Sequence, residues 1–153
     1  MIWEGGYVNS AVDSGGETKY GISKKSFPNV DIKNLTEEDA KTIYYQEYWL
    51  KAKCHLIPHD KISEKLFLVC VNCGVSRGVK IFQECINLSK VAQSVDVDGI
   101  IGKRTIQAFN EIVEKDLFLE SFSCRIIRFY NAIVDRKKSQ SVFLYGWVRR
   151  ALF

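Results

Sequence analysis

The sequence predicts a mainly α-helical protein with one small β-hairpin near its N-terminus. Apolar residues recur every three or four positions through most segments after residue 36, which is the period of an amphipathic helix. Before residue 22 the chain instead carries the pairs Gly5-Gly6 and Gly15-Gly16, which let a backbone double back. With 153 residues, 46% of them apolar and 26% charged, the chain is long enough for a soluble domain with a real core.

The first predicted helix begins after Thr36 and runs to about Leu50. Asp39 follows Thr36 by three residues. This spacing is typical of a capping box, in which the N-cap residue and the third helical residue exchange hydrogen bonds. The residues expected on its inward face are Ala40, Ile43, Tyr44 and Tyr48. A second helix is predicted over about residues 61–73. Gly74 is expected to end it, because glycine readily adopts the positive φ of a C-terminal cap.

The later helices follow the same apolar spacing. Ser76 is predicted to cap a third helix, Thr105 to start a fourth, and residues 115–136 to form the longest. The expected inward residues are Val79, Phe82 and Ile86 in the third helix, Ile106, Phe109 and Val113 in the fourth, and Leu119, Phe122, Ile126, Phe129 and Ile133 in the longest. Residues 141–153 repeat the spacing, and either pack over the bundle or present aromatic rings to a ligand.

The pattern changes between Ser89 and Lys103, where V-D-V-D-G-I-I-G alternates and ends in glycine. This break predicts two lobes, residues 1–88 and residues 89–153, packed as one compact unit. Asp98-Gly99 within it is equally compatible with a plain turn before a helix, since the Asx turn is common there.

Acidic and hydroxyl side chains gather in the glycine-rich stretch from Glu4 to Ile22. Cleavage of a glycosidic bond needs a protonated carboxyl that donates to the leaving oxygen and a second anionic group that steers water or stabilises the oxocarbenium-like state. Glu4 fits the acid and Asp13 its partner, while the Thr18 hydroxyl can hold the attacking water. The alternative for such a stretch is a simple hairpin loop.

The motifs E-G-G-Y-V-N, D-S-G-G-E-T and Y-G-I in this order resemble the start of glycoside hydrolase family 108, whose members are N-acetylmuramidases and often phage endolysins. The resemblance continues through I-Y-Y-Q-E-Y-W, V-N-C-G, D-G-I-I-G-K-R-T-I-Q-A and G-W-V-R-R, and so spans nearly the whole chain. It implies a lysozyme-like α+β fold whose hairpin carries the active site, with Glu4 as catalytic acid. The order of Glu4, Asp13 and Thr18 also resembles the catalytic triad of phage T4-type lysozymes.

The implied reaction is hydrolysis of the β-1,4 bond between N-acetylmuramic acid and N-acetylglucosamine in peptidoglycan, with water as nucleophile and no cofactor. The stretch from Asp98 to Phe109 resembles peptidoglycan-binding modules. Aromatic rings stack on sugars and amides bind N-acetyl groups, so the candidate substrate contacts are Tyr7, Tyr20, Tyr48, Trp49 and Asn72. Each has a structural alternative, such as packing between lobes or fixing a helix end.

Two departures from the family pattern define a rival reading. Only Met1, Ile2 and Trp3 precede Glu4, where the family has a helix, and Leu68 stands where relatives carry an aspartate. A general acid needs apolar cover to raise its pKa. The rival is therefore a catalytically weak or inactive peptidoglycan-binding or secretion-helper module.

Five cysteines form an odd set, which is typical of reduced thiols in a protein made in the cytoplasm. Cys70 and Cys73 have metal-ligand spacing but fall on an apolar helix face, so we expect core thiols and no metal site. His55 and His59 flank Pro58 and are expected on the surface.

The chain has a net charge of +4, and basic residues gather near its C-terminus, in R-K-K at 136–138 and R-R at 149–150. These residues either are solvated helix ends or attract the anionic cell wall. The sequence carries no nucleic-acid motif, no apolar run long enough for a membrane span and no signal-peptide pattern. We therefore expect synthesis in the cytoplasm without a signal peptide, holin-dependent export and action on the wall in the periplasm, with the oligomeric state left open.

Overall fold

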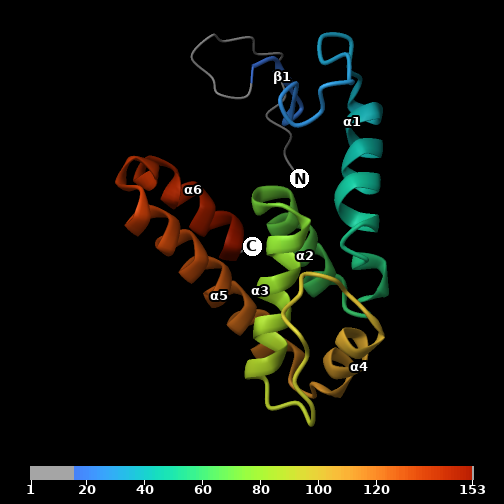
Figure 1. The fold of residues 1–153 in the computed structure, drawn as a ribbon, viewed down its shortest axis with the longest axis vertical. Coiled ribbons are helices and arrows are strands. Elements are labelled where there is room, and N and C mark those ends of the chain that lie inside the picture. Colours follow the sequence, from blue (N-terminus) through green and yellow to red (C-terminus); the bar gives the residue numbers. More distant parts are fainter. Residues whose placement is uncertain (1–15, 153) are drawn as a thin grey trace. The chain divides into compact units, whose positions relative to one another are not determined.

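A computed structural model of the chain describes residues 16–152 (Figure 1). The chain forms two compact units, Met1–Gln46 and Glu47–Phe153. We call their described parts, residues 16–46 and residues 47–152, the hairpin unit and the helical unit. The elements are mostly helical, with one two-stranded antiparallel sheet near the N-terminus, which confirms the predicted fold class.

The hairpin unit begins with the sheet, formed by β1 (Thr18–Lys19) and β2 (Ile22–Ser23). Thr18 pairs with Ser23 and Lys19 with Ile22. The two residues of the turn, Tyr20 and Gly21, have φ angles of 50° and 75°, which is the left-handed pair that a tight hairpin turn favours. The turn therefore falls within the Y-G-I motif.

Helix α1 (Glu37–Tyr44) completes this unit and starts as the sequence predicts. The Asp39 amide donates to the Thr36 hydroxyl oxygen at 3.1 Å, and the Thr36 amide donates to the Asp39 carboxylate at 3.1 Å. The chain continues as a π-helix, η1 (Tyr45–Leu50), so the helical stretch ends at Leu50 as expected, but its last six residues are π-helical rather than α-helical.

The helical unit contains five α-helices and two short 3-10 turns among its described residues. The helices are α2 (Asp60–Cys73), α3 (Val75–Leu88), α4 (Lys103–Glu111), α5 (Lys115–Arg136) and α6 (Ser141–Leu152). The 3-10 turns are η2 (Cys54–Leu56) and η3 (Lys138–Gln140). Helix α2 packs against α3, and α5 packs against both α3 and α6.

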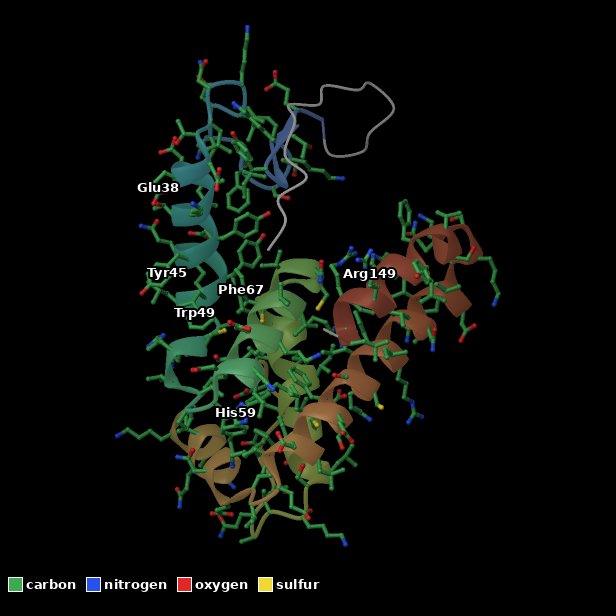
Figure 2. The ribbon with its side chains drawn as sticks, turned by 180° about the vertical axis from the view of Figure 1, so that it is seen from behind. Glu38, Tyr45, Trp49, His59, Phe67 and Arg149 are labelled. Carbon is green, nitrogen blue, oxygen red and sulfur yellow. The ribbon has the colours of Figure 1, made fainter. Side chains whose placement is uncertain are left out.

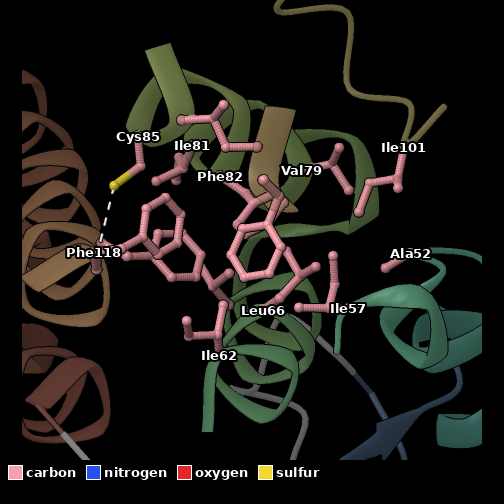
Figure 3. Packing of buried hydrophobic residues seen from close by; sticks show 14 of the residues in the cluster. Ala52, Ile57, Ile62, Leu66, Val79, Ile81, Phe82, Cys85, Ile101 and Phe118 are labelled. Atoms are coloured by element: carbon pink, nitrogen blue, oxygen red, sulfur yellow. Dashed lines mark hydrogen bonds between the residues drawn. The ribbon is translucent and has the colours of Figure 1, made fainter. Parts of the chain in front are cut away.

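Phe82 of α3 lies at the centre of the core of the helical unit (Figure 3). Its ring centroid is 5.5 Å from that of Phe109 and 5.6 Å from those of Phe118 and Phe122. Aromatic pairs at such separations add to the free energy gained from burial alone. The predicted inward residues Val79, Ile86 and Ile126 are buried in the same cluster.

Three sequence predictions about helix ends are wrong. Ser76 does not cap α3, because the helix begins one residue earlier, directly after Gly74, and no side chain caps it. Val113 does not face inward: its side chain is 91% exposed, because α4 ends at Glu111. Helix α4 also starts two residues before Thr105, which is buried inside its first turn.

The cysteine prediction is confirmed for Cys70, which is buried, while Cys73 is half-buried; all five cysteines are free thiols. Burial raises the pKa of Cys73 to about 11 and the pKa of Cys85 to about 12, so these thiols stay protonated at neutral pH. His55 is exposed, as expected, and His59 is half-buried. Within residues 16–152 no helix is long and apolar enough to cross a membrane.

Candidate functional site

Glu4, Tyr7 and Asp13, three of the predicted site residues, lie outside the described residues. Thr18, the third member of the predicted catalytic set, is half-buried in β1. Its hydroxyl donates to the Gly16 carbonyl at 3.2 Å. A hydroxyl oxygen used as a donor still has lone pairs, so the Thr18 oxygen can accept a hydrogen bond from water.

Tyr20 follows in the hairpin turn, where a tyrosine of α1 fixes the backbone. The Tyr44 hydroxyl donates to the Tyr20 carbonyl at 3.2 Å. A Cβ atom on Gly21 would lie 2.5 Å from the Tyr44 hydroxyl oxygen, so a larger residue there would require the Tyr44 side chain to move. The Lys19 ammonium lies 5.5 Å from the centroid of the Tyr20 ring. Two predicted site residues, Thr18 and Tyr20, thus lie on one hairpin whose tip is tied to α1.

Tyr48 and Trp49 lie in the π-helix and pack against the core of the helical unit. The Trp49 ring meets Phe67 of α2 edge to face, with centroids 5.8 Å apart (Figure 2). Burial is the main cause that raises the pKa of Tyr48. Both rings are half-buried and so have packing partners as well as exposed edges.

Asn72 lies near the end of α2 and is exposed. Burial raises the pKa of Tyr130 to about 12, and a hydrogen bond with Asn72 acts in the opposite direction. The helix end itself is closed by the Gly74 amide, which donates to the Cys70 carbonyl at 2.8 Å. The end of α2 is therefore closed by backbone hydrogen bonding at Gly74.

A second candidate site is the D-G-I-I-G loop, which the side chain of Gln83 holds in place. Gln83 is 1% exposed, and its amide nitrogen donates to Asp98 Oδ1 at 2.8 Å and to the Ile100 carbonyl at 3.0 Å. Its amide oxygen accepts from the Gly99 amide at 2.9 Å. The Ile100 amide also donates to Asp98 Oδ1 at 2.8 Å, which is the Asx turn that the sequence left as one of two readings.

Asn87 holds the same loop one helical turn further along α3. Its amide nitrogen donates to the Val95 carbonyl at 2.9 Å, and its oxygen accepts from the Val95 amide at 2.7 Å. The hydrogen bond from Gln83 is the largest cause that lowers the pKa of Asp98. A cavity of about 340 Å³ lies beside the loop, and its lining includes Asp96 and Lys103.

Gln83 and Asn87 are functional-site residues that the sequence patterns did not identify. The only signal in the sequence is two amide side chains four residues apart in an apolar helix, and it does not indicate the loop that they bind. Among the described residues, no group of three or more His, Cys, Asp or Glu side chains is arranged to hold a metal ion.

Each half of the chain matches a known protein family. Residues 1–74 match the family described as Glycosyl hydrolase 108, and residues 77–152 match the family described as Predicted Peptidoglycan domain. No curated protein matches the chain. Among solved structures, Brucella abortus SagA is 24% identical, over 97% of this chain and 87% of SagA, with a TM-score of 0.74. At that identity, SagA shows only that the fold is shared.

The matched segments coincide with the motifs that suggested them. The glycosyl hydrolase match contains the stretch from Glu4 to Ile22, and the peptidoglycan match contains the D-G-I-I-G loop that Gln83 and Asn87 hold. The chain therefore joins a glycosyl hydrolase 108 segment, residues 1–74, to a predicted peptidoglycan domain, residues 77–152, and is a peptidoglycan hydrolase.

Proposed function

We propose that this hydrolase is an N-acetylmuramidase that uses Glu4 as general acid and Asp13 and Thr18 to position the attacking water. The observation that carries the proposal is the glycosyl hydrolase 108 match over the segment that contains all three residues. In this reaction Glu4 protonates the oxygen that leaves from the β-1,4 bond. Water adds to the sugar carbon and loses a proton, which Asp13 accepts.

The geometry of Thr18 supports its role. Its oxygen keeps acceptor capacity while its proton is held by the Gly16 carbonyl, and its strand is paired with β2. A fixed hydroxyl orients water better than a freely rotating one, because less freedom is lost when the reactive geometry forms.

For the substrate contacts we propose Tyr7, Tyr20, Tyr48, Trp49 and Asn72. The support is strongest for Tyr20, which shares the hairpin with Thr18 and whose backbone is fixed by Tyr44. Replacing Tyr20 by Ala should raise KM more than it lowers kcat, which steady-state kinetics on purified walls would measure.

We also propose that residues 1–88 form the catalytic lobe and residues 89–153 the wall-binding lobe. The two family matches meet close to this division, at residues 74 and 77. Limited proteolysis of the full chain would test the proposed boundary, because cleavage close to residue 88 is expected and cleavage only far from it would contradict the division.

The proposed route to the wall starts in the cytoplasm and uses a separate export step, such as a holin. The five free thiols support synthesis in a reducing compartment. Fractionation of cells that express the protein with and without a holin would test this route. Lysis that is independent of any holin would contradict it.

The products of digestion test the proposed reaction. Mass spectrometry of wall fragments should find reducing N-acetylmuramic acid ends. Anhydro ends would instead identify a transglycosylase. Retention on peptidoglycan without any released ends would favour the rival, a catalytically inactive binding module.

A further inference from the structure

A groove in the helical unit carries no assigned role. It has a volume of about 730 Å³ and lies between α4 and the segment around η2, which Figure 1 shows next to each other. Its lining residues are Lys53, Leu56, Lys103, Ile106, Gln107, Asn110 and Glu111. Pockets of this size are typical of sites for small ligands.

One face of α4 supplies most of the lining. Residues 103, 106, 107, 110 and 111 follow the i, i+3, i+4, i+7, i+8 pattern, so they form a single stripe along the helix. The opposite wall comes from Lys53 and from Leu56, which is 44% exposed although its side chain is apolar.

The charges of the groove are divided between its ends. Lys103 is the first residue of α4, where the helix dipole is positive, and the Lys53 ammonium donates to the carbonyl of nearby Ile101 at 2.8 Å. An ammonium has three donor hydrogens, so Lys53 can bind a ligand as well as Ile101. Glu111 is the last residue of α4 and already accepts from the Ala92 amide at 3.3 Å. One end of the groove is therefore cationic.

The side chains between the ends suit a peptide better than a sugar. Gln107 and Asn110 can each donate to and accept from an amide group, and Leu56 with Ile106 provides apolar contact. The described lining contains no aromatic side chain on which a sugar ring would stack.

We propose that this groove binds the short carboxylate-bearing peptides that are attached to N-acetylmuramic acid in peptidoglycan. The peptide carboxylate lies at Lys53 and Lys103, and its backbone amides face Gln107 and Asn110. The inference rests on the proposed function, because peptidoglycan is the substrate of that reaction. The lining comes from both family segments, since Lys53 lies within residues 1–74 and α4 within residues 77–152.

Binding to purified walls tests the proposal when turnover is blocked. The full-length Glu4→Gln variant is incubated with intact walls and with walls whose peptides have been removed by an amidase. We expect binding to the stripped walls to be about tenfold weaker, the loss that one charge-assisted hydrogen bond accounts for. Equal binding to both kinds of wall would overturn the proposal.

Groove variants identify the site. In the same background, Lys103→Glu and the isosteric Asn110→Asp should each weaken binding to intact walls about tenfold. Lys103→Glu places a negative charge beside the peptide carboxylate, and Asn110→Asp removes the amide donor that faces the peptide backbone. Lys61→Glu is the matched control, because Lys61 is also an exposed lysine in the first turn of a helix. The control should bind like its parent. Groove variants that bind as well as the control would contradict the proposal.

Hydrolysis by the chain with native Glu4 separates the two proposals. The circular dichroism spectrum of Lys103→Glu should match that of its parent, which excludes a general loss of folding. Absence of hydrolysis by the unmodified chain would count against the muramidase proposal alone, because wall binding is measured without turnover. Unchanged wall binding by Lys103→Glu, with hydrolysis by the unmodified chain intact, would count against the groove alone.

Discussion

One tyrosine fixes the turn of the hairpin, whereas a cluster of phenylalanines forms the core of the helical unit. In the hairpin unit, Tyr44 holds the turn through one hydrogen bond and one close approach to Gly21. In the helical unit, Phe82 contacts three other rings, contributed by α4 and α5. The first arrangement sets the direction of a few polar groups. The second provides a rigid support for surfaces such as the groove beside α4.

Among the described residues, the two units differ in the longest sequence separation that a hydrogen bond spans: 24 residues from Tyr44 to Tyr20 in the hairpin unit, and 86 residues from Lys65 to Ala151 in the helical unit. Thr18 bonds to Gly16, two residues away, and Thr36 exchanges hydrogen bonds with Asp39, three residues away. Gln83 reaches across 16 residues to Gly99, and the buried Lys65 donates across 86 residues to the Ala151 carbonyl at 2.6 Å. Motifs therefore reveal the chemistry of the hairpin unit, while only the tertiary structure reveals the binding surfaces of the helical unit.

Removing the central ring should have the largest effect on stability. Phe82→Ala should lower the free energy of unfolding of the helical unit by about 3–5 kcal/mol, because it leaves a cavity among three aromatic neighbours. Denaturant unfolding followed by tryptophan fluorescence would measure the change. Tyr145→Ala is the control, since Tyr145 is 82% exposed, and it should be nearly neutral. Equal effects of the two variants would contradict the aromatic core.

Loss of the hydrogen bonds between Gln83 and the D-G-I-I-G loop should have an intermediate effect on stability. Gln83→Leu keeps the approximate size of the side chain but leaves the Gly99 amide without its partner, which should cost about 1–3 kcal/mol. Hydrogen exchange at Gly99 should accelerate. The exposed Gln93→Leu in the same loop should leave exchange at Gly99 unchanged.

Alanine substitutions at Gly16 and Gly21 should separate the effect of backbone strain from the effect of a steric clash. Gly16 and Gly21 both have positive φ, so an alanine at either position costs about 1–2 kcal/mol. Only at Gly21 does the added Cβ also meet the Tyr44 hydroxyl. Gly21→Ala should therefore accelerate exchange of the Ile22 amide more than Gly16→Ala does, and Tyr44→Phe should remove part of that excess. Equal exchange rates of the Ile22 amide in Gly21→Ala and Gly16→Ala would contradict the contact between the hairpin turn and Tyr44.

The cap of α1 should have the smallest effect. Thr36→Ala should cost about 1 kcal/mol. The hydrogen bond from the Thr36 hydroxyl is the largest cause that lowers the pKa of Asp39 below its ordinary value of 3.8. A lowered folded-state pKa adds stability above the unfolded-state pKa, and that stability is lost as the pH falls through the folded-state value. The difference between Thr36→Ala and the unmodified chain should shrink on acidification below about pH 4, measured by thermal unfolding.

Helix boundaries were predictable where apolar spacing and end signals agree. Helix α5 runs over residues 115–136 as predicted, because its apolar stripe is continuous. Val113 was misassigned because the apolar spacing continues past the end of α4. The Lys115 ammonium donates there to the Phe109 carbonyl at 2.7 Å and to the Ile112 carbonyl, so it closes the helix. That contact depends on a turn of the chain, which the spacing does not encode.

The candidate sites were predictable where their residues are close together in the sequence, and not where the fold brings distant residues together. The hairpin followed from glycines within the stretch that carries Thr18, and the Asx turn followed from Asp98-Gly99. The groove did not, because Lys53 and Lys103 are 50 positions apart and meet only through the fold. The partner of Gln83 was hidden in the same way, since an amide shows no sequence preference for a loop 16 residues away.

The most direct measurement is the release of reducing ends from purified peptidoglycan by the Glu4→Gln variant. This change keeps the shape of the side chain and removes its acidic proton. The release should fall by about 100-fold or more, the usual contribution of a general acid, while the circular dichroism spectrum stays the same. Glu38→Gln, the same change on an exposed face of α1, should keep full activity. Full activity of Glu4→Gln would contradict the assignment of the catalytic acid.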